Sequence, residues 1–288
     1  METKTVTFDF FRVQVEGTTL DTILNETFAE DEEERNEMIR GHVYRLQELQ
    51  KRGSLMVGEM LRLRMDDAAL KARASGGPPD LVPLLEDEGL AEETAFAFHP
   101  KLKVLALQRH KFGTSPWTLS GYLEQASGFS PIVFEPILEK GALQKLAKMN
   151  DIRAFDFQVA GANQEIYDGL GLGMKELGRL ANRTGAPQVR LRMSMGHATG
   201  SMAGDAVKTL ARALFDRAAV GEVTRIRITG RDPSGELEPL DLLRHRMVEF
   251  AEIELDGKRM PHVKRAAALR QAFEHRNDEL IEMFEGLP

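Results

Sequence analysis

Two short apolar segments, residues 94–99 and 104–107, constrain the fold of this chain more than any other feature. Large and small apolar side chains alternate in the first segment (TAFAFH), so both faces of a strand there would be apolar. Strands of this kind lie in the middle of a sheet with other elements covering both sides. Pro100 suits the second position of a turn, because its φ is already fixed at the required value. The two segments therefore predict a central β-hairpin.

A helix is expected directly after this hairpin. Ser115 is a residue type that caps helix N-termini, and Pro116 occupies a position where a missing N–H costs nothing. An apolar stripe follows at helical spacing and consists of Leu119, Tyr122, Leu123 and Ala126. The pattern predicts a helix that packs one face against the sheet.

The segments before the hairpin are mostly extended. Residues 4–15 predict a strand with a bulge near Phe10, and residues 20–28 predict a helix. Residues 39–50 are compatible with either helix or strand, whereas residues 54–65 alternate as a strand does. We favour a hairpin that joins the two through residues 51–53. The SGGPPD sequence within residues 66–83 predicts a surface loop.

The second half alternates strands with helices. Strands are expected at 155–159, 189–195 and 225–228, with helices at 174–181, 207–214 and 263–284. If the segment from 189 to 228 is a right-handed crossover, its helix covers the apolar strand face. The predicted fold class is α+β, with mixed, largely antiparallel sheets, covering helices, a basic strand–helix–strand unit and a long C-terminal helix. The predicted domains are 1–128 (acidic), 129–262 (basic) and 263–288 (the closing helix).

The distribution of charge is the strongest indication of function. The net charge is −9 over residues 1–139, +7 over 140–231 and −5 over 232–288, for a total of −7. Arginines alternate with apolar residues on the two strands of the basic unit, so they are expected to share the face away from the core. This pattern indicates a surface that follows phosphates, although an ion-paired, solvated face is the competing interpretation. The candidate nucleic-acid-binding residues are Arg190, Arg192, Arg225, Arg227, Lys208, Arg212, Lys145, Lys148 and Arg153.

The sequence shows no pattern typical of a catalytic, metal-binding or cofactor-binding site. The chain has no cysteine, which excludes disulfides and thiolate catalysis and is compatible with a reducing cytoplasm. The histidines lack metal-ligand spacing, and GLGLG at 169–173 matches no phosphate-binding pattern, so we predict no cofactor, no metal and no catalytic residues. A metal-dependent nuclease would need a lysine partner for the carboxylates of 80–88, which the pattern does not supply. No segment has the length of a membrane span, and no signal peptide is evident, so a cytoplasmic protein is expected.

From about Leu84 onward, the order of segments resembles the A component of the phage lambda Rex exclusion system. The features that carry this resemblance are an acidic Gly-Leu turn, an F-G-x-x-S-type loop, a Glu-Pro dipeptide after an apolar strand and a D-x-x-G turn. They correspond here to residues 88–90, 112–115, 135–136 and 232–235, followed in both chains by a closing helix. The resemblance implies a dimeric, non-enzymatic DNA-binding protein that acts in exclusion of other phages. The sequence EDEGLAEETAFAF is also similar to a bacterial family of unknown function.

We therefore predict a non-enzymatic, largely sequence-independent DNA-binding protein of a phage or mobile element that acts in anti-phage defence. It would contact the phosphate backbone of duplex DNA, form a homodimer and work with a protein partner encoded nearby. The acidic front half would serve dimerisation, partner binding or auto-inhibition. The alternatives are a protein–protein interaction module or inhibitor that uses its acidic surface, and a metal-dependent nuclease.

Overall fold

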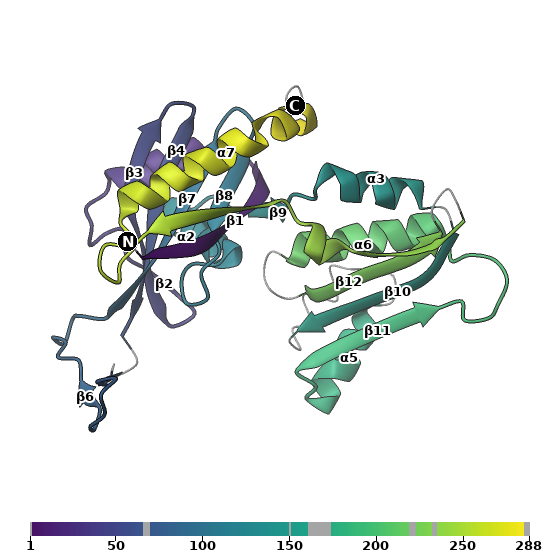
Figure 1. Cartoon of the computed structure of the whole chain (residues 1–288), viewed down its shortest axis with the longest axis horizontal. Helices are drawn as coiled ribbons and strands as arrows, with labels where there is room; N and C mark the ends of the chain where they lie inside the picture. The colour runs from purple at the N-terminus through teal and green to yellow at the C-terminus, as the bar shows by residue number, and fades with distance from the viewer. Residues whose placement is uncertain are drawn as a thin grey trace. The chain divides into compact units, whose positions relative to one another are not determined.

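A computed structural model describes residues 2–65, 70–149, 151–160, 174–218, 223–231 and 235–284. The chain forms two compact units. Unit 1 comprises Met1–Phe8, Val13–Val133 and Glu249–Pro288, and unit 2 comprises Asp9–Arg12 and Phe134–Val248. Each unit combines an antiparallel sheet with packed helices, which confirms the predicted α+β class (Figure 1). The glycine loop at 169–173 and most of the 232–235 turn lie outside the described residues.

Unit 1 is built on an eight-stranded sheet of order β14-β1-β8-β7-β4-β3-β2, in which β9 also pairs with β1. A separate two-stranded ribbon, β5-β6, interrupts the predicted surface loop. The strands are β1 (Thr3–Val15), β2 (Glu37–Ile39), β3 (His42–Arg52), β4 (Leu55–Arg64), β5 (Leu70–Lys71), β6 (Asp80–Leu81), β7 (Leu90–His99), β8 (Val104–Gln108), β9 (Ile132–Pro136) and β14 (Val248–Glu254). The helices are α1 (Leu20–Ala29), α2 (Pro116–Ser127) and α7 (His262–Phe284).

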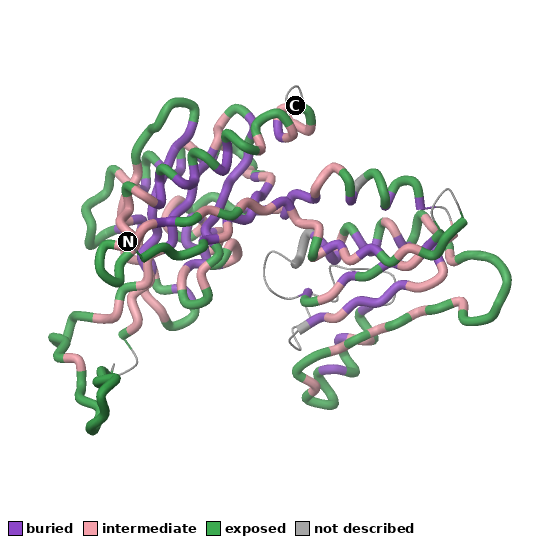
Figure 2. Tube along the Cα trace, in the orientation of Figure 1, coloured by how far each residue is buried: buried purple, intermediate pink, exposed green. Residues whose placement is uncertain are grey.

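The predicted central hairpin is β7–β8, and it lies between β4 and β1 in the middle of the sheet. Ala95, Phe96, Ala97 and Phe98 are each at most 2% exposed, so both faces of β7 are covered. Figure 2 shows the same concentration of buried residues along these strands. The predicted β3–β4 hairpin is also present, with the strands paired from Val43 and Leu63 to Arg52 and Leu55.

The helix predicted after the hairpin is α2, and its ends follow the expected chemistry. The Ser115 side chain accepts a hydrogen bond from the backbone N–H of Thr118, and Pro116 is the first helical residue. At the other end Gly128 adopts a φ of 72°, a left-handed conformation that glycine tolerates without strain. The Tyr122 hydroxyl bridges the backbone of Arg35 and Leu46, and burial raises its pKa to about 12.

The C-terminal segments differ from the predicted domain bounds. The sequence predicts that 249–262 belongs to the basic domain and that 263–288 is separate, whereas both segments belong to unit 1. The physical reason is that β14 joins the unit 1 sheet at its edge, and α7 buries Ala266, Leu269 and Phe273 against β7 and β4. In Figure 1, α7 runs across the strands of this sheet.

Gly58 in β4 marks a place where the sheet admits no side chain. A Cβ atom there would lie 2.7 Å from Cε1 of Phe96 and 2.9 Å from the carbonyl oxygen of Glu48. We expect Gly58→Ala to destabilise unit 1 by about 1–3 kcal/mol, because the packed ring must move. Gly121→Ala in α2 is the matched control: its nearest neighbour is Ile39 at 4.0 Å, so a gain of about 0.4–1 kcal/mol is expected.

The measurement for both variants is urea unfolding followed by tryptophan fluorescence. Trp117 is the chain's single tryptophan and lies in α2, so its emission reports on unit 1. Equal stabilities for Gly58→Ala and the wild-type protein would show that Phe96 is not fixed in its observed position.

Unit 2 contains a four-stranded sheet of order β11-β10-β12-β13. Strand β10 pairs antiparallel with both β11 and β12, so the two strands of the predicted strand–helix–strand unit flank a third strand between them. The strands are β10 (Asp151–Ala160), β11 (Gln188–Ser194), β12 (Val223–Arg231) and β13 (Leu237–Asp241). The helices are α3 (Lys140–Lys148), α5 (Met174–Thr184), α6 (Gly204–Ala218) and the short 3-10 helix η1 (Leu242–His245).

The core of unit 2 lies on one face of this sheet. Phe155, Phe157, Ile226 and Ile228 of the central strands are fully buried in a single hydrophobic cluster. Helices α3, α5 and α6 all contribute to it, through Ala142, Leu146, Met174, Val207, Leu210, Ala211 and Leu214. Because strand side chains alternate between faces, the residues between these apolar positions point to the opposite face.

Candidate nucleic-acid interface

Strand register brings four arginines to the face of the unit 2 sheet that lies opposite its core. Arg192 and Arg227 lie directly across from Asp156 of β10, and Arg190 and Arg225 lie directly across from Gln158. Residues directly opposite each other in paired strands point to the same face. We call the four residues Arg190, Arg192, Arg225 and Arg227 the arginine face.

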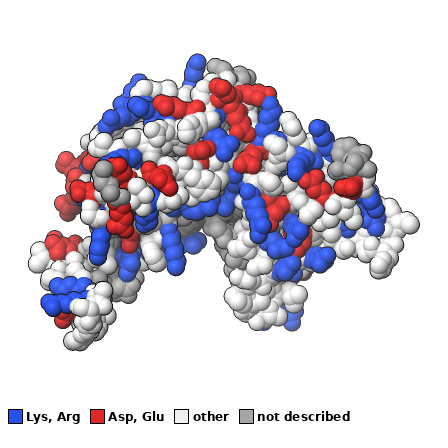
Figure 3. Space-filling view, viewed as in Figure 1, with Lys and Arg blue, Asp and Glu red and all other residues white. Residues whose placement is uncertain are grey.

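Within unit 2, no described helix covers the arginine face. Arg190, Arg192 and Arg227 are exposed and Arg225 is half-buried, whereas the described helices of unit 2 contribute to the core on the other side. Figure 3 shows blue side chains gathered over the strands of this sheet, with a few acidic residues among them. The expectation that these arginines share a face therefore matches their register.

One carboxylate, that of Asp156, pairs with two of the four guanidinium groups of the arginine face. Arg190 donates to both carboxylate oxygens of Asp156, from Nε at 2.9 Å and from Nη2 at 2.6 Å. Arg225 Nε donates to Oδ2 of the same carboxylate at 2.8 Å. The hydrogen bond from Arg190, with help from Arg225 and against the effect of burial, lowers the pKa of Asp156 below its ordinary value. Asp156 is thus ionised at neutral pH and orients two guanidinium groups along the sheet.

Arg192 and Arg227 differ from this pair. No carboxylate of a described residue lies within 4.0 Å of either guanidinium group. Asp241 lies across from Arg227 in the register, but its carboxylate is 3.7 Å from Arg244. With respect to the described residues, the arginine face therefore contains two paired and two unpaired cations, which combines the two interpretations of the sequence.

The other five candidate cations do not join the arginine face. Arg153 donates to the carbonyl oxygens of Gly196, Ala198 and Gly200, so it holds the 196–200 loop in place. The remaining four lie on α3 and α6, the helices that pack against the opposite face of the sheet. Lys145 pairs with Glu238, Lys208 donates to the carbonyl of Ala147 at 3.2 Å, and Lys148 and Arg212 are solvent-exposed.

A second charge cluster, which is not among the sites predicted from the sequence, lies between α7 and the sheet of unit 1. Arg265 and Glu59 are each 2% exposed and form an ion pair, and Arg265 also donates to Glu93 at 2.8 Å. His262 Nδ1 lies 3.0 Å from a Glu59 oxygen, and Arg259 pairs with Glu93 at the edge of the cluster. Burial alone would raise the pKa of Glu93, but its hydrogen bonds to Arg259 and Arg265 lower it. The sequence signal for this cluster is Glu59 within the apolar run LMVGEML.

Within the described ranges, no group of three or more His, Asp or Glu side chains is arranged to hold a metal ion. In the same residues, no helix has both the length and the apolar character that crossing a bilayer requires.

These features define a two-unit α+β protein with an open, partly neutralised arginine surface on one sheet. The chain belongs to a family of unknown function, DUF6731, whose model matches residues 1–281. No curated protein matches the sequence.

Proposed function

We propose that the protein binds the phosphate backbone of duplex DNA through the arginine face, without catalysis and with little sequence readout. The observation that carries the proposal is the alignment of four guanidinium groups on one sheet face of unit 2, opposite the face that packs against the hydrophobic core and its helices. A guanidinium group can donate two parallel hydrogen bonds to two oxygens of one phosphate. The strands space the arginines at regular intervals, because every second residue points to the same face. Arg192 and Arg227 are the primary contacts, because neither must leave a carboxylate of a described residue first.

Salt dependence tests the proposal directly. Each neutralised phosphate contributes about 0.9 to the slope of log affinity against log salt concentration. Two to four contacts should therefore give a slope between about −2 and −4 for a duplex of random sequence, measured by fluorescence polarisation. Complete absence of binding at low salt, or binding that is indifferent to salt, contradicts the proposal.

Two double variants, each of which removes two positive charges, test whether DNA binds at the arginine face. Arg192→Gln/Arg227→Gln should weaken binding and reduce the slope by about two units, one for each lost contact. Lys148→Gln/Arg212→Gln removes the same charge from α3 and α6 and should leave the slope close to that of the wild-type protein. An equal loss in both variants would indicate a diffuse attraction and not a site on the sheet.

The second candidate function is a protein-interaction module that uses the acidic surface of unit 1. Exposure favours this function. Residues 30–34 are all acidic and all exposed. The large apolar side chains of Leu70, Leu81 and Leu85 are exposed as well. In the DNA assay this function predicts no binding at any salt concentration. Divalent-dependent cleavage of the same duplex would instead indicate the nuclease. Homodimerisation and a role in phage exclusion stay predictions that rest on the resemblance to the Rex component.

A further inference from the structure

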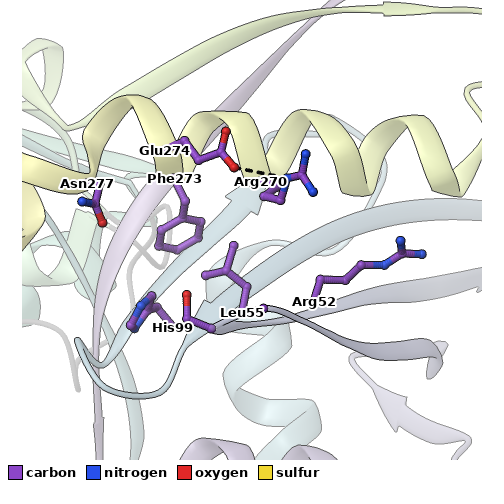
Figure 4. A pocket seen from close by; sticks show the side chains of 9 residues that line it. Arg52, Leu55, His99, Arg270, Phe273, Glu274 and Asn277 are labelled. Carbon is purple, nitrogen blue, oxygen red and sulfur yellow. Dashed lines mark ion pairs between the residues drawn. The ribbon is translucent and has the colours of Figure 1, made fainter.

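A small cleft in unit 1 lies between α7 and the end of the β3–β4 hairpin, next to the last residue of β7 (Figure 4). Its volume is about 290 Å³, close to the lower end of the range for small-molecule sites. The lining residues are Arg52, Gly53, Ser54, Leu55, His99, Arg270, Phe273, Glu274 and Asn277.

The inner wall of the cleft is apolar. Leu55 and Phe273 are 4% and 5% exposed, and the His99 and Phe273 rings lie 6.4 Å apart between centroids, tilted by 38°. Figure 4 shows the Phe273 side chain pointing from α7 toward Leu55 and His99. A ligand that enters the cleft would therefore meet rings and methyl groups at its inner end.

The rim of the cleft is cationic. Arg52 and Arg270 are exposed and lie on different elements, the β3–β4 hairpin and α7. With the described residues, each makes one hydrogen bond or ion pair: Arg52 Nη2 donates to Gln50 at 2.8 Å, and Arg270 Nε lies 3.3 Å from Glu274. A guanidinium group has five N–H donors, so both arginines keep donors for a ligand. With Glu274 as the only carboxylate among the described lining residues, these residues give the rim a net charge of +1.

His99 adds a neutral donor to the wall. Its Nδ1 accepts a hydrogen bond from the backbone N–H of Leu102 at 3.2 Å. In the neutral ring the proton is then on Nε2, which becomes a donor. Burial, more than the nearby charge of Lys101, lowers the pKa of His99, which favours this neutral form at pH 7.

We propose that this cleft binds a small organic anion, namely a phosphate monoester or carboxylate attached to a compact apolar group. Arg52 and Arg270 at the rim would hold the anionic group, because guanidinium forks match the oxygens of both anions. Leu55 and Phe273 would contact the apolar group. The site lies wholly in unit 1 and does not depend on DNA binding by unit 2.

The experiment is a titration of the full chain with phenyl phosphate, benzoate, inorganic phosphate and the neutral benzyl alcohol. The readout is the Cε1–H NMR signal of His99, assigned by comparison with His99→Asn. At least one aromatic anion should shift this signal saturably at millimolar concentrations, and benzyl alcohol and inorganic phosphate should bind more weakly. The stronger of the phenyl phosphate and benzoate responses identifies the anionic group.

Arg52→Gln/Arg270→Gln should weaken binding of the aromatic anion at least about tenfold, because charge-assisted hydrogen bonds are lost. Arg73→Gln, an exposed arginine of the β5–β6 segment, is the matched control and should bind as the wild-type protein does. Unchanged Trp117 emission would verify that each variant is folded. The proposal is overturned if neither aromatic anion shifts the His99 signal, if the double variant keeps full affinity, or if benzyl alcohol binds equally well.

Discussion

Unit 1 is expected to lose about 3 kcal/mol of unfolding free energy when Glu59 is replaced by Gln. The substitution removes the main counter-charge of Arg265, and both side chains are only 3% exposed. A buried guanidinium group that loses its partner keeps its desolvation cost without the compensating attraction, which typically costs 3–5 kcal/mol. We expect the lower end of this range because Glu93 still accepts a hydrogen bond from Arg265. The measurement is urea unfolding followed by Trp117 fluorescence.

Glu254→Gln supplies the matched control. Glu254 forms an ion pair of 2.9 Å with Lys264, but the two side chains are 46% and 41% exposed, so a loss below about 1 kcal/mol is expected. A double variant, Glu59→Leu/Arg265→Met, should be more stable than Glu59→Gln because it removes the buried charges together. If Glu59→Gln and Glu254→Gln cost the same, water must reach the Glu59–Arg265 pair.

The elements of the fold were predictable where local patterns determine them. Alternation on both faces identified β7 and β8 as central strands, and the Ser115–Pro116 pair located the start of α2. These features depend on neighbouring residues and on turn and cap chemistry. The sequence predicts the C-terminal helix but not the unit to which it belongs. No local pattern in residues 263–284 indicates which sheet their apolar stripe covers.

Long-range pairing explains what the sequence did not reveal about the charged sites. Alternation placed Arg190, Arg192, Arg225 and Arg227 on the outer side of their strands, and that much follows from strand geometry. It does not determine that β10 lies between β11 and β12, which brings Asp156 within hydrogen-bonding distance of two arginines. Arg265 and Glu59 are likewise distant in the chain, and only the packing of α7 on β4 brings them together.

Asp156→Asn is expected to strengthen DNA binding, which is the opposite of the usual effect of changing a buried charged residue. Asp156 binds Arg190 and Arg225, and its lowered pKa means that the wild-type side chain carries a full negative charge at neutral pH. Asparagine keeps the shape but removes the charge, so both guanidinium groups become available to phosphates. Each new contact should make the log–log salt slope steeper by about 0.9, for a total change of up to about two units.

Asp205→Asn separates this local effect from the change in net charge. Asp205 is exposed in the first turn of α6, the helix that packs on the core side of the sheet, and its replacement changes the net charge of the protein by the same amount. If repulsion between DNA and the whole protein limits binding, the two variants should gain affinity equally. If the Asp156 carboxylate competes with phosphates for Arg190 and Arg225, only Asp156→Asn should steepen the slope. A folded Asp156→Asn protein, verified by far-ultraviolet circular dichroism, with unchanged DNA affinity would show that these two arginines serve the sheet and do not contact DNA.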